Sequence, residues 1–133
     1  DAPLERRVAV HHAVSAALAR GLVRACHDIS DGGLLTAAAE MAIAAGKGVA
    51  VRLPARDLDA EAFGDRVASY VVEIDRARFV EAESHFAAIA GVRLIAVGRV
   101  IDQPRLVLTS ERELLAEVAV ADLTRAWRGT LDW

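Results

Sequence analysis

The sequence predicts an α+β domain in which a mixed, largely antiparallel sheet is covered by helices. Segments with helical spacing of apolar residues alternate with short apolar or alternating segments along the chain. Two of the predicted strands, 92–101 and 105–110, are separated only by a turn at Gln103-Pro104, so they must run antiparallel. Neither GxGxxG nor GxxxxGK[ST] occurs, so the standard dinucleotide and P-loop signatures are absent. These observations argue against a doubly wound parallel fold.

Size and composition narrow the class of protein. The chain has 133 residues, of which 54% are hydrophobic, so we expect one compact globular domain over 1–133. A net charge of −3, no cluster of Lys and Arg, and 5% aromatic residues argue against a nucleic-acid partner. No apolar run reaches the roughly 20 residues of a membrane span, and the N-terminus lacks a signal-peptide pattern. Because Cys26 is the only cysteine, no internal disulfide can form, and we expect a cytoplasmic protein.

The first half of the chain is predicted to form a helix, a strand, a second helix and a second strand, over residues 4–21, 22–29, 31–45 and 49–54. Val10, Val14 and Leu18 share one face of the first helix. The first strand is a short apolar run, and the second alternates until a proline stops it. Gly21 is placed to end the first helix, and Gly46 and Gly48 the second.

The second half is predicted to form a short helix or turn, a strand, a helix, three strands and a last helix, over residues 57–64, 68–75, 76–91, 92–101, 105–110, 113–120 and 121–129. Asp75 is placed to cap the helix that Gly91 ends. Trp127 and Trp133 are expected to anchor the last helix. The chain contains no low-complexity segment, internal repeat or linker.

The segment HDISDGG, between the first strand and the second helix, is the main candidate site. Ser30 or Asp31 is placed to cap the helix, which is worth about 1 kcal/mol. Gly32 and Gly33 disfavour a helix start by up to about 1 kcal/mol each, so they suggest that backbone approaches something closely. One interpretation is a capped turn with tight packing; the other is an anion site, in which Ser30, Asp31, Gly32 and Gly33 face a phosphate. In the second case Asp28 and Asp31 need a cation such as Mg²⁺ between them and the phosphate.

Other chemistry-bearing residues have simpler interpretations. His27, Asp28 and Asp31 could be metal ligands, but three ligands in five residues at the end of a strand point in different directions. His11 and His12 are neighbours on a helix, diverge by about 100°, and are expected on a solvated face. Cys26 lies in an apolar run and is expected to be a buried structural thiol rather than a nucleophile.

The string HDISDGGL followed by AEMAIAAGKGVAV resembles the C-terminal domain of the phosphoribosylformylglycinamidine synthase family, among the aminoimidazole ribonucleotide synthetase-like ATP-dependent enzymes. Supporting pieces are ARGLVRAC, FGD, SYVVEID, AGVRLIAVGRV and AWRGTL, and the resemblance covers Leu4 to Leu131. The family has an arginine before the tyrosine of SYVVEID, whereas this chain has Ser69. Thiamine-monophosphate kinase, selenophosphate synthetase and the hydrogenase maturation factor carry related turns, but not the whole string.

The resemblance implies an aminoimidazole ribonucleotide synthetase C-terminal domain-like fold and a place in purine biosynthesis. Enzymes of this family use ATP and Mg²⁺ to convert formylglycinamide ribonucleotide and glutamine-derived ammonia to formylglycinamidine ribonucleotide, ADP and phosphate. The family's catalytic histidine and its substrate- and ATP-binding motifs lie in upstream domains, so no catalytic residue is expected in this chain. The implied roles here are phosphate or nucleotide binding at Ser30, Asp31, Gly32 and Gly33, and Mg²⁺ binding at Asp28.

The same resemblance implies partners. The chain would be a fragment of the synthetase subunit of the small bacterial form, inactive alone and in need of no cofactor. Its expected partners are the upstream ATP-binding domains, a separate glutaminase subunit and a small accessory subunit. A sheet that normally packs against another domain also suggests a homodimer of the isolated chain. The alternatives are a non-enzymatic regulatory or assembly module, and a domain of another synthetase or kinase of the superfamily.

Overall fold

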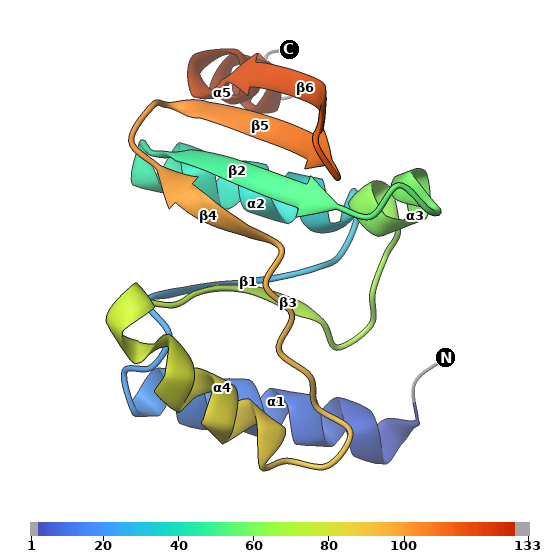
Figure 1. The fold of residues 1–133 in the computed structure, drawn as a ribbon, viewed down its shortest axis with the longest axis vertical. Coiled ribbons are helices and arrows are strands. Elements are labelled where there is room, and N and C mark those ends of the chain that lie inside the picture. The colour runs from blue at the N-terminus through green and yellow to red at the C-terminus, as the bar shows by residue number, and fades with distance from the viewer. Residues whose placement is uncertain (1–2, 130–133) are drawn as a thin grey trace. The chain divides into compact units, whose positions relative to one another are not determined.

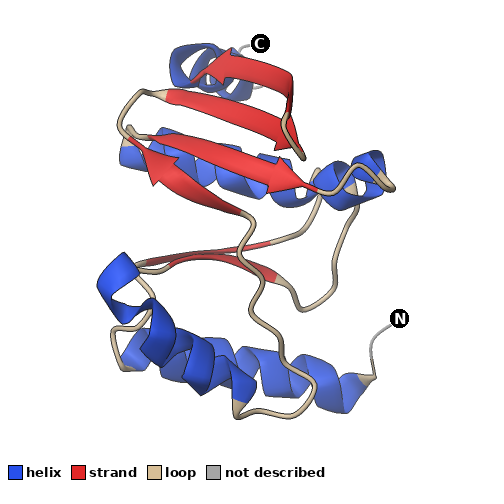
Figure 2. Cartoon of the chain, viewed as in Figure 1, coloured by secondary structure: helices blue, strands red, loops and turns tan. Residues whose placement is uncertain are grey.

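The computed structural model describes residues 3–129, and the chain divides into two compact units (Figure 1). The first unit comprises residues up to Ser30 together with Asp65–Ala96. The second comprises Asp31–Gly64 and the residues from Val97 onward. Each unit contains both helices and strands (Figure 2), so the predicted α+β class is confirmed.

The first unit contains a two-stranded antiparallel sheet and two main helices, made from α1 (Leu4–Ala19), β1 (Ala25–Asp28), β3 (Tyr70–Glu73), the 3-10 helix η1 (Arg76–Arg78) and α4 (Phe79–Ala87). Its core lies where α1 meets α4. Ala13, Ala17 and Ala82 are fully buried, and such small side chains let two helices approach closely. The other buried members of this core are Val14, Leu22, Val23 and Phe86.

The second unit contains a four-stranded mixed sheet in the order β4-β2-β5-β6 and three helices, made from α2 (Gly33–Ala45), β2 (Gly48–Leu53), α3 (Leu58–Phe63), β4 (Gly98–Ile101), β5 (Arg105–Ser110), β6 (Glu113–Ala119) and α5 (Val120–Gly129). Strands β2 and β5 are parallel, whereas β4 pairs with β2, and β6 with β5, in antiparallel fashion. Of the four strand pairs between residues 3 and 129, three are antiparallel, as the sequence predicts.

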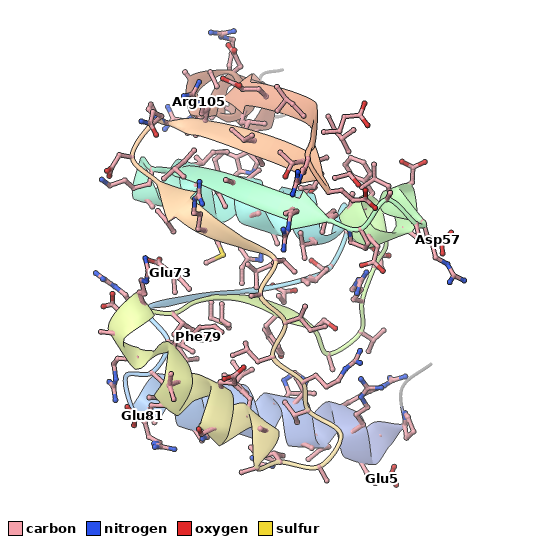
Figure 3. All side chains as sticks on the ribbon, in the orientation of Figure 1. Glu5, Asp57, Glu73, Phe79, Glu81 and Arg105 are labelled. Carbon is pink, nitrogen blue, oxygen red and sulfur yellow. The ribbon has the colours of Figure 1, made fainter. Side chains whose placement is uncertain are left out.

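The sheet of the second unit has one covered and one open face. Val51 and Leu108 are directly opposite each other and are both buried, while the neighbouring Arg52 is exposed, which is the period-two pattern of a strand buried on one side. Figure 1 shows α2 and α5 behind this sheet, and both helices contact its strands. On the other face Arg105, labelled in Figure 3, forms an ion pair of 2.5 Å with Glu117 of the neighbouring strand.

Three expectations about elements need correction. The strand predicted over 92–101 begins only at Gly98. It is antiparallel to the strand 105–110, but the two do not form a hairpin, because β2 lies between them. Trp127 is 55% exposed and does not anchor α5, and Trp133 lies outside the described residues. Within residues 3–129, no helix is both long and apolar enough to cross a membrane.

Candidate functional site

The segment HDISDGG leaves β1 at Asp28 and enters α2 at Gly33, and it passes from the first unit to the second after Ser30. The predicted side-chain cap by Ser30 or Asp31 is wrong. The N-cap residue of α2 is Gly32, with a φ of 83°, and no side chain caps the helix. Only glycine adopts this left-handed conformation without a steric penalty, so the backbone itself makes the turn into the helix.

The paired glycines have a packing explanation inside the second unit. A Cβ on Gly33 would lie 2.5 Å from both Cα and the carbonyl carbon of Phe63, at the end of α3. A Cβ on Gly32 would lie 2.4 Å from Oγ1 of Thr36, whose hydroxyl donates to the Gly32 carbonyl over 2.8 Å. Both glycines also have a positive φ. The absence of a side chain at Gly33 therefore lets α2 begin directly against α3, and its absence at Gly32 leaves room for the Thr36 hydroxyl.

Exposure divides the candidate phosphate-binding residues into two groups. Ser30, Asp31 and Gly32 are exposed, whereas Gly33 is buried. Asp28 is also exposed, and its carbonyl accepts a 2.7 Å hydrogen bond from Nδ1 of His27. No group of three or more His, Cys, Asp or Glu side chains in the described chain is placed to hold a metal ion. Among the described residues, Asp28 is therefore not part of a preformed metal site made of such side chains.

A hydrogen-bonded pair that the sequence analysis missed lies beside Asp28 in the first unit. The Tyr70 hydroxyl lies 2.5 Å from Nδ1 of His11, and the two rings meet edge to face with centroids 5.6 Å apart. Asp28 is directly opposite Tyr70 in the β1–β3 ladder. The pKa of Tyr70 is raised mainly by burial, and further by the charges of Cys26 and Asp28. The pKa of Cys26 is raised mainly by burial and further by Asp28. The half-buried Cys26 therefore stays a thiol at neutral pH, as expected for a structural cysteine.

The raised pKa of Tyr70 gives a direct prediction. Tyr70 is the only tyrosine of the chain, so an ultraviolet titration of the phenolate reports on it alone. We expect a midpoint above the usual value of about 10. Because the pKa of Tyr70 is higher in the folded than in the unfolded chain, its contribution to the free energy of unfolding is fully present below about pH 10. This contribution is lost as the pH rises through the folded pKa. Asp28→Asn should lower the midpoint only in part, since burial is the larger cause. A midpoint equal to that of free tyrosine amide would contradict this environment.

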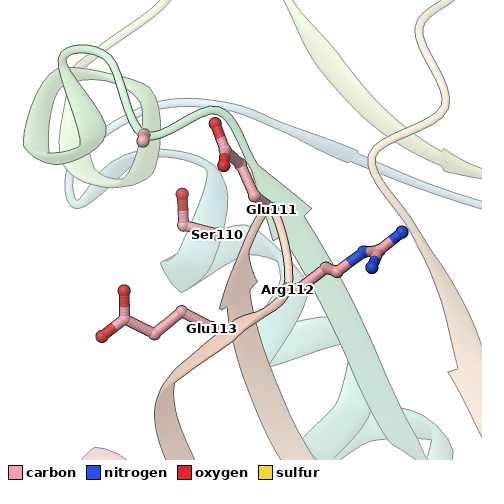
Figure 4. A pocket seen from close by; sticks show the side chains of 5 residues that line it. Ser110, Glu111, Arg112 and Glu113 are labelled. Carbon is pink, nitrogen blue, oxygen red and sulfur yellow. The ribbon is translucent and has the colours of Figure 1, made fainter.

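An open hollow of about 360 Å³ lies at the turn between β5 and β6 (Figure 4). Ser110, Glu111, Arg112 and Glu113 line it together with Ala55, and the side chain of Arg112 points away from that of Glu113. Oγ of Ser110 is buried without a hydrogen-bond partner among the described residues. No sequence motif marks this turn, and the divergent side chains do not converge on a common point.

Comparison with known proteins identifies the family of this chain. The family model described as AIR synthase related protein, C-terminal domain, matches residues 1–111. A phosphoribosylformylglycinamidine synthase subunit PurL of Salinibacter ruber is 36% identical over 136 aligned positions, which cover 98% of this chain and 18% of that protein. The corresponding subunit of Sinorhizobium fredii is 43% identical over 82 residues, or 62% of this chain and 11% of that protein. The chain therefore spans less than a fifth of the length of these relatives.

Solved structures show the same fold. "T. maritima PurL complexed with FGAR" superposes with a TM-score of 0.77 over 88% of this chain and 20% of that chain, at 20% identity. The structure of PurLQS from Thermotoga maritima gives a TM-score of 0.71 over 88% of this chain and 21% of that chain, at 23% identity. The family model covers most of the chain. This chain thus belongs to the family of AIR synthase related proteins, as their C-terminal domain.

Proposed function

We propose that this chain is the C-terminal domain of a phosphoribosylformylglycinamidine synthase, the ATP-dependent ligase of purine biosynthesis. The complete enzyme would convert formylglycinamide ribonucleotide, glutamine-derived ammonia and ATP to formylglycinamidine ribonucleotide, ADP and phosphate. The observation that carries the proposal is the alignment of 98% of this chain with the Salinibacter ruber synthase subunit at 36% identity. Solved structures of T. maritima PurL with FGAR and with ATP support the substrate and the nucleotide.

Within that enzyme, the chain would act as scaffold and as one wall of a phosphate or nucleotide site. Ser30, Asp31 and Gly32 are the exposed residues at the start of α2 that would face the phosphate, because free amides at a helix N-terminus favour an anion. Gly33 would contribute mainly by letting α2 pack on α3. Asp28 would contact Mg²⁺ that is also held by the substrate phosphates. No residue of this chain is assigned a catalytic role.

The partners would be the ATP-binding domains of a longer polypeptide, a glutaminase subunit and a small accessory subunit. The solved assembly of PurLQS from Thermotoga maritima supports a partnership of that kind. We place the complete enzyme in the cytoplasm, in keeping with a single cysteine in 133 residues. Self-association of the isolated chain stays a prediction. The strands that could pair with a second copy are β4 and β6, the edges of the sheet of the second unit.

The activity assay separates the role of this chain from that of the complete enzyme. With ATP, formylglycinamide ribonucleotide and ammonium, the 133-residue chain alone should form no product. The complete polypeptide encoded by the same reading frame should form formylglycinamidine ribonucleotide and ADP, and a version that stops before Asp1 should not. Turnover by the isolated chain would overturn the scaffold role. A folded complete polypeptide that hydrolyses no ATP with this substrate would overturn the proposed function.

A further inference from the structure

A histidine joins the two helices of the first unit. Nδ1 of His85, on α4, lies 2.9 Å from NH1 of Arg20, the residue that follows α1. Nε2 of the same ring lies 2.9 Å from the carbonyl oxygen of Ala13, in the middle of α1. We propose that His85 is a proton-operated link between α1 and α4, which holds Arg20 when neutral and changes to Glu81 of its own helix when charged.

The partners of the ring determine its neutral tautomer. A guanidinium group only donates hydrogen bonds, so Nδ1 of His85 must accept from Arg20 and carries no proton. A carbonyl oxygen only accepts, so Nε2 carries the proton and donates to Ala13. Both ring nitrogens are thus used, and both bonds run to α1. In its neutral form His85 holds α4 to the second half of α1.

Protonation removes one of these bonds. The added proton on Nδ1 would face an N–H group of Arg20, whose nitrogen lies 2.9 Å away. Two hydrogen-bond donors and two positive charges would then face each other, and they repel. The bond to Ala13 survives, since Nε2 keeps its proton. Arg20 therefore has to move away from the ring, and the link from α4 to the end of α1 opens.

A second partner for charged His85 is already in place. Glu81 lies four residues before His85 on α4, which is the spacing at which an acidic side chain and a following cation pair on a helix. In the neutral state Glu81 accepts from Arg20 over 3.2 Å and from Arg78 over 2.9 Å. These arginines hold the pKa of Glu81 below its usual value, so it stays charged when His85 gains a proton. Arg78 also donates to the carbonyls of Gly21, over 2.7 Å, and of Arg20, over 3.4 Å, so the far end of α1 keeps these contacts.

His11, another paired histidine of the unit, behaves differently. The partner of Nδ1 in His11 is the hydroxyl of Tyr70, which can donate or accept. When His11 is charged, Nδ1 donates and the hydroxyl accepts, so the contact persists. The chemical nature of the partner, rather than the presence of a histidine, thus makes the His85 link sensitive to protons.

Hydrogen exchange of the 133-residue chain tests the link. From about pH 8 to about pH 5, the protection of the amides between Ala13 and Arg20, corrected for intrinsic rates, should fall about tenfold. His85→Gln can still donate to the Ala13 carbonyl but does not titrate, so its protection factors should change less than about twofold over the same range. The matched control is His12→Gln, an exposed histidine on α1, which should keep the tenfold fall.

The outcomes decide between a link and a merely structural histidine. The proposal would be overturned if the protection of these amides in the wild-type chain did not change with pH. It would also be overturned if their protection fell in His85→Gln as much as in the wild-type chain. If His85→Gln does not fold, the nitrogen chemical shifts of the wild-type ring give an independent test. The proposal requires a proton on Nε2 above neutral pH, and a proton on Nδ1 would refute it.

Discussion

Gly33→Ala is expected to lower the free energy of unfolding by about 3 kcal/mol. The new methyl group would lie 2.5 Å from two backbone atoms of Phe63 and 2.7 Å from the carbonyl oxygen of Ala62. Backbone atoms cannot rotate away as a side chain can, so α2 or α3 has to shift. The φ of 71° adds a left-handed penalty that alanine does not escape.

Gly46→Ala is the matched control for that substitution. Gly46 has a similar φ of 63°, but nothing lies within 4 Å of a Cβ built there. It should therefore cost only the backbone penalty of about 1 kcal/mol. Urea unfolding followed by circular dichroism measures both losses. Equal losses for the two variants would mean that α2 does not need the close approach to α3.

This contrast also decides how the candidate phosphate site can be studied. A substitution at Gly33 would disturb the packing of α2 whatever the loop binds, so lost binding in Gly33→Val would not identify a phosphate contact. Ser30 and Asp31 are exposed and make no cap bond to α2, so they can be changed with little effect on the fold. Nucleotide or sulfate binding should therefore be compared between the wild-type chain and variants at these two positions.

Local patterns in the sequence predicted most of the elements. The alanine-rich run ending at Gly46 forms α2, and the alternation before Pro54 forms β2. The failures occur where a residue serves a distant neighbour. Val92 and Leu94 have the alternation of a strand, yet they pack against the core of the first unit, and the strand starts only at Gly98. Alternation reports burial on one side and does not by itself reveal a hydrogen-bonded partner strand.

The segments 92–101 and 105–110 do not form a hairpin, and the reason is similar. A short turn between 92–101 and 105–110 predicts neighbouring strands, but β2 inserts between them and runs parallel to β5. A signal for this was present in Gly48, whose only apparent role in the sequence was to end a helix. A Cβ at that position would lie 1.9 Å from the carbonyl oxygen of Gln103, so β2 passes the turn at a distance that only glycine permits. One sequence does not show which backbone approaches a glycine.

The candidate site was predicted in position but not in geometry. The structure confirms the change from strand to helix at HDISDGG. It could be predicted because the sequence has different periodicities on the two sides of this segment. The predicted side-chain cap was wrong because α2 begins with Gly32 in a left-handed conformation and no side chain caps it. The sequence alone does not determine this backbone conformation. The pair of His11 and Tyr70 joins residues 59 positions apart, which no local pattern reveals.

The first unit should depend strongly on one aromatic side chain. Phe86 is 3% exposed and packs with Ala13, Ala17 and Ala82, none of which can fill the space that its ring leaves. Phe86→Ala is therefore expected to lower the free energy of unfolding by about 3 to 5 kcal/mol. The measurement is again urea unfolding, with the hydrogen-exchange protection of α1 as a local report.

Val80→Ala, on the same helix, is the control. Val80 is 73% exposed, so its truncation should change the stability by less than about 0.5 kcal/mol. Both variants place alanine at a helical position, so differences in helix propensity between them are small beside the cavity left by the ring. If the two truncations cost the same, the contact between α1 and α4 is not a packed core.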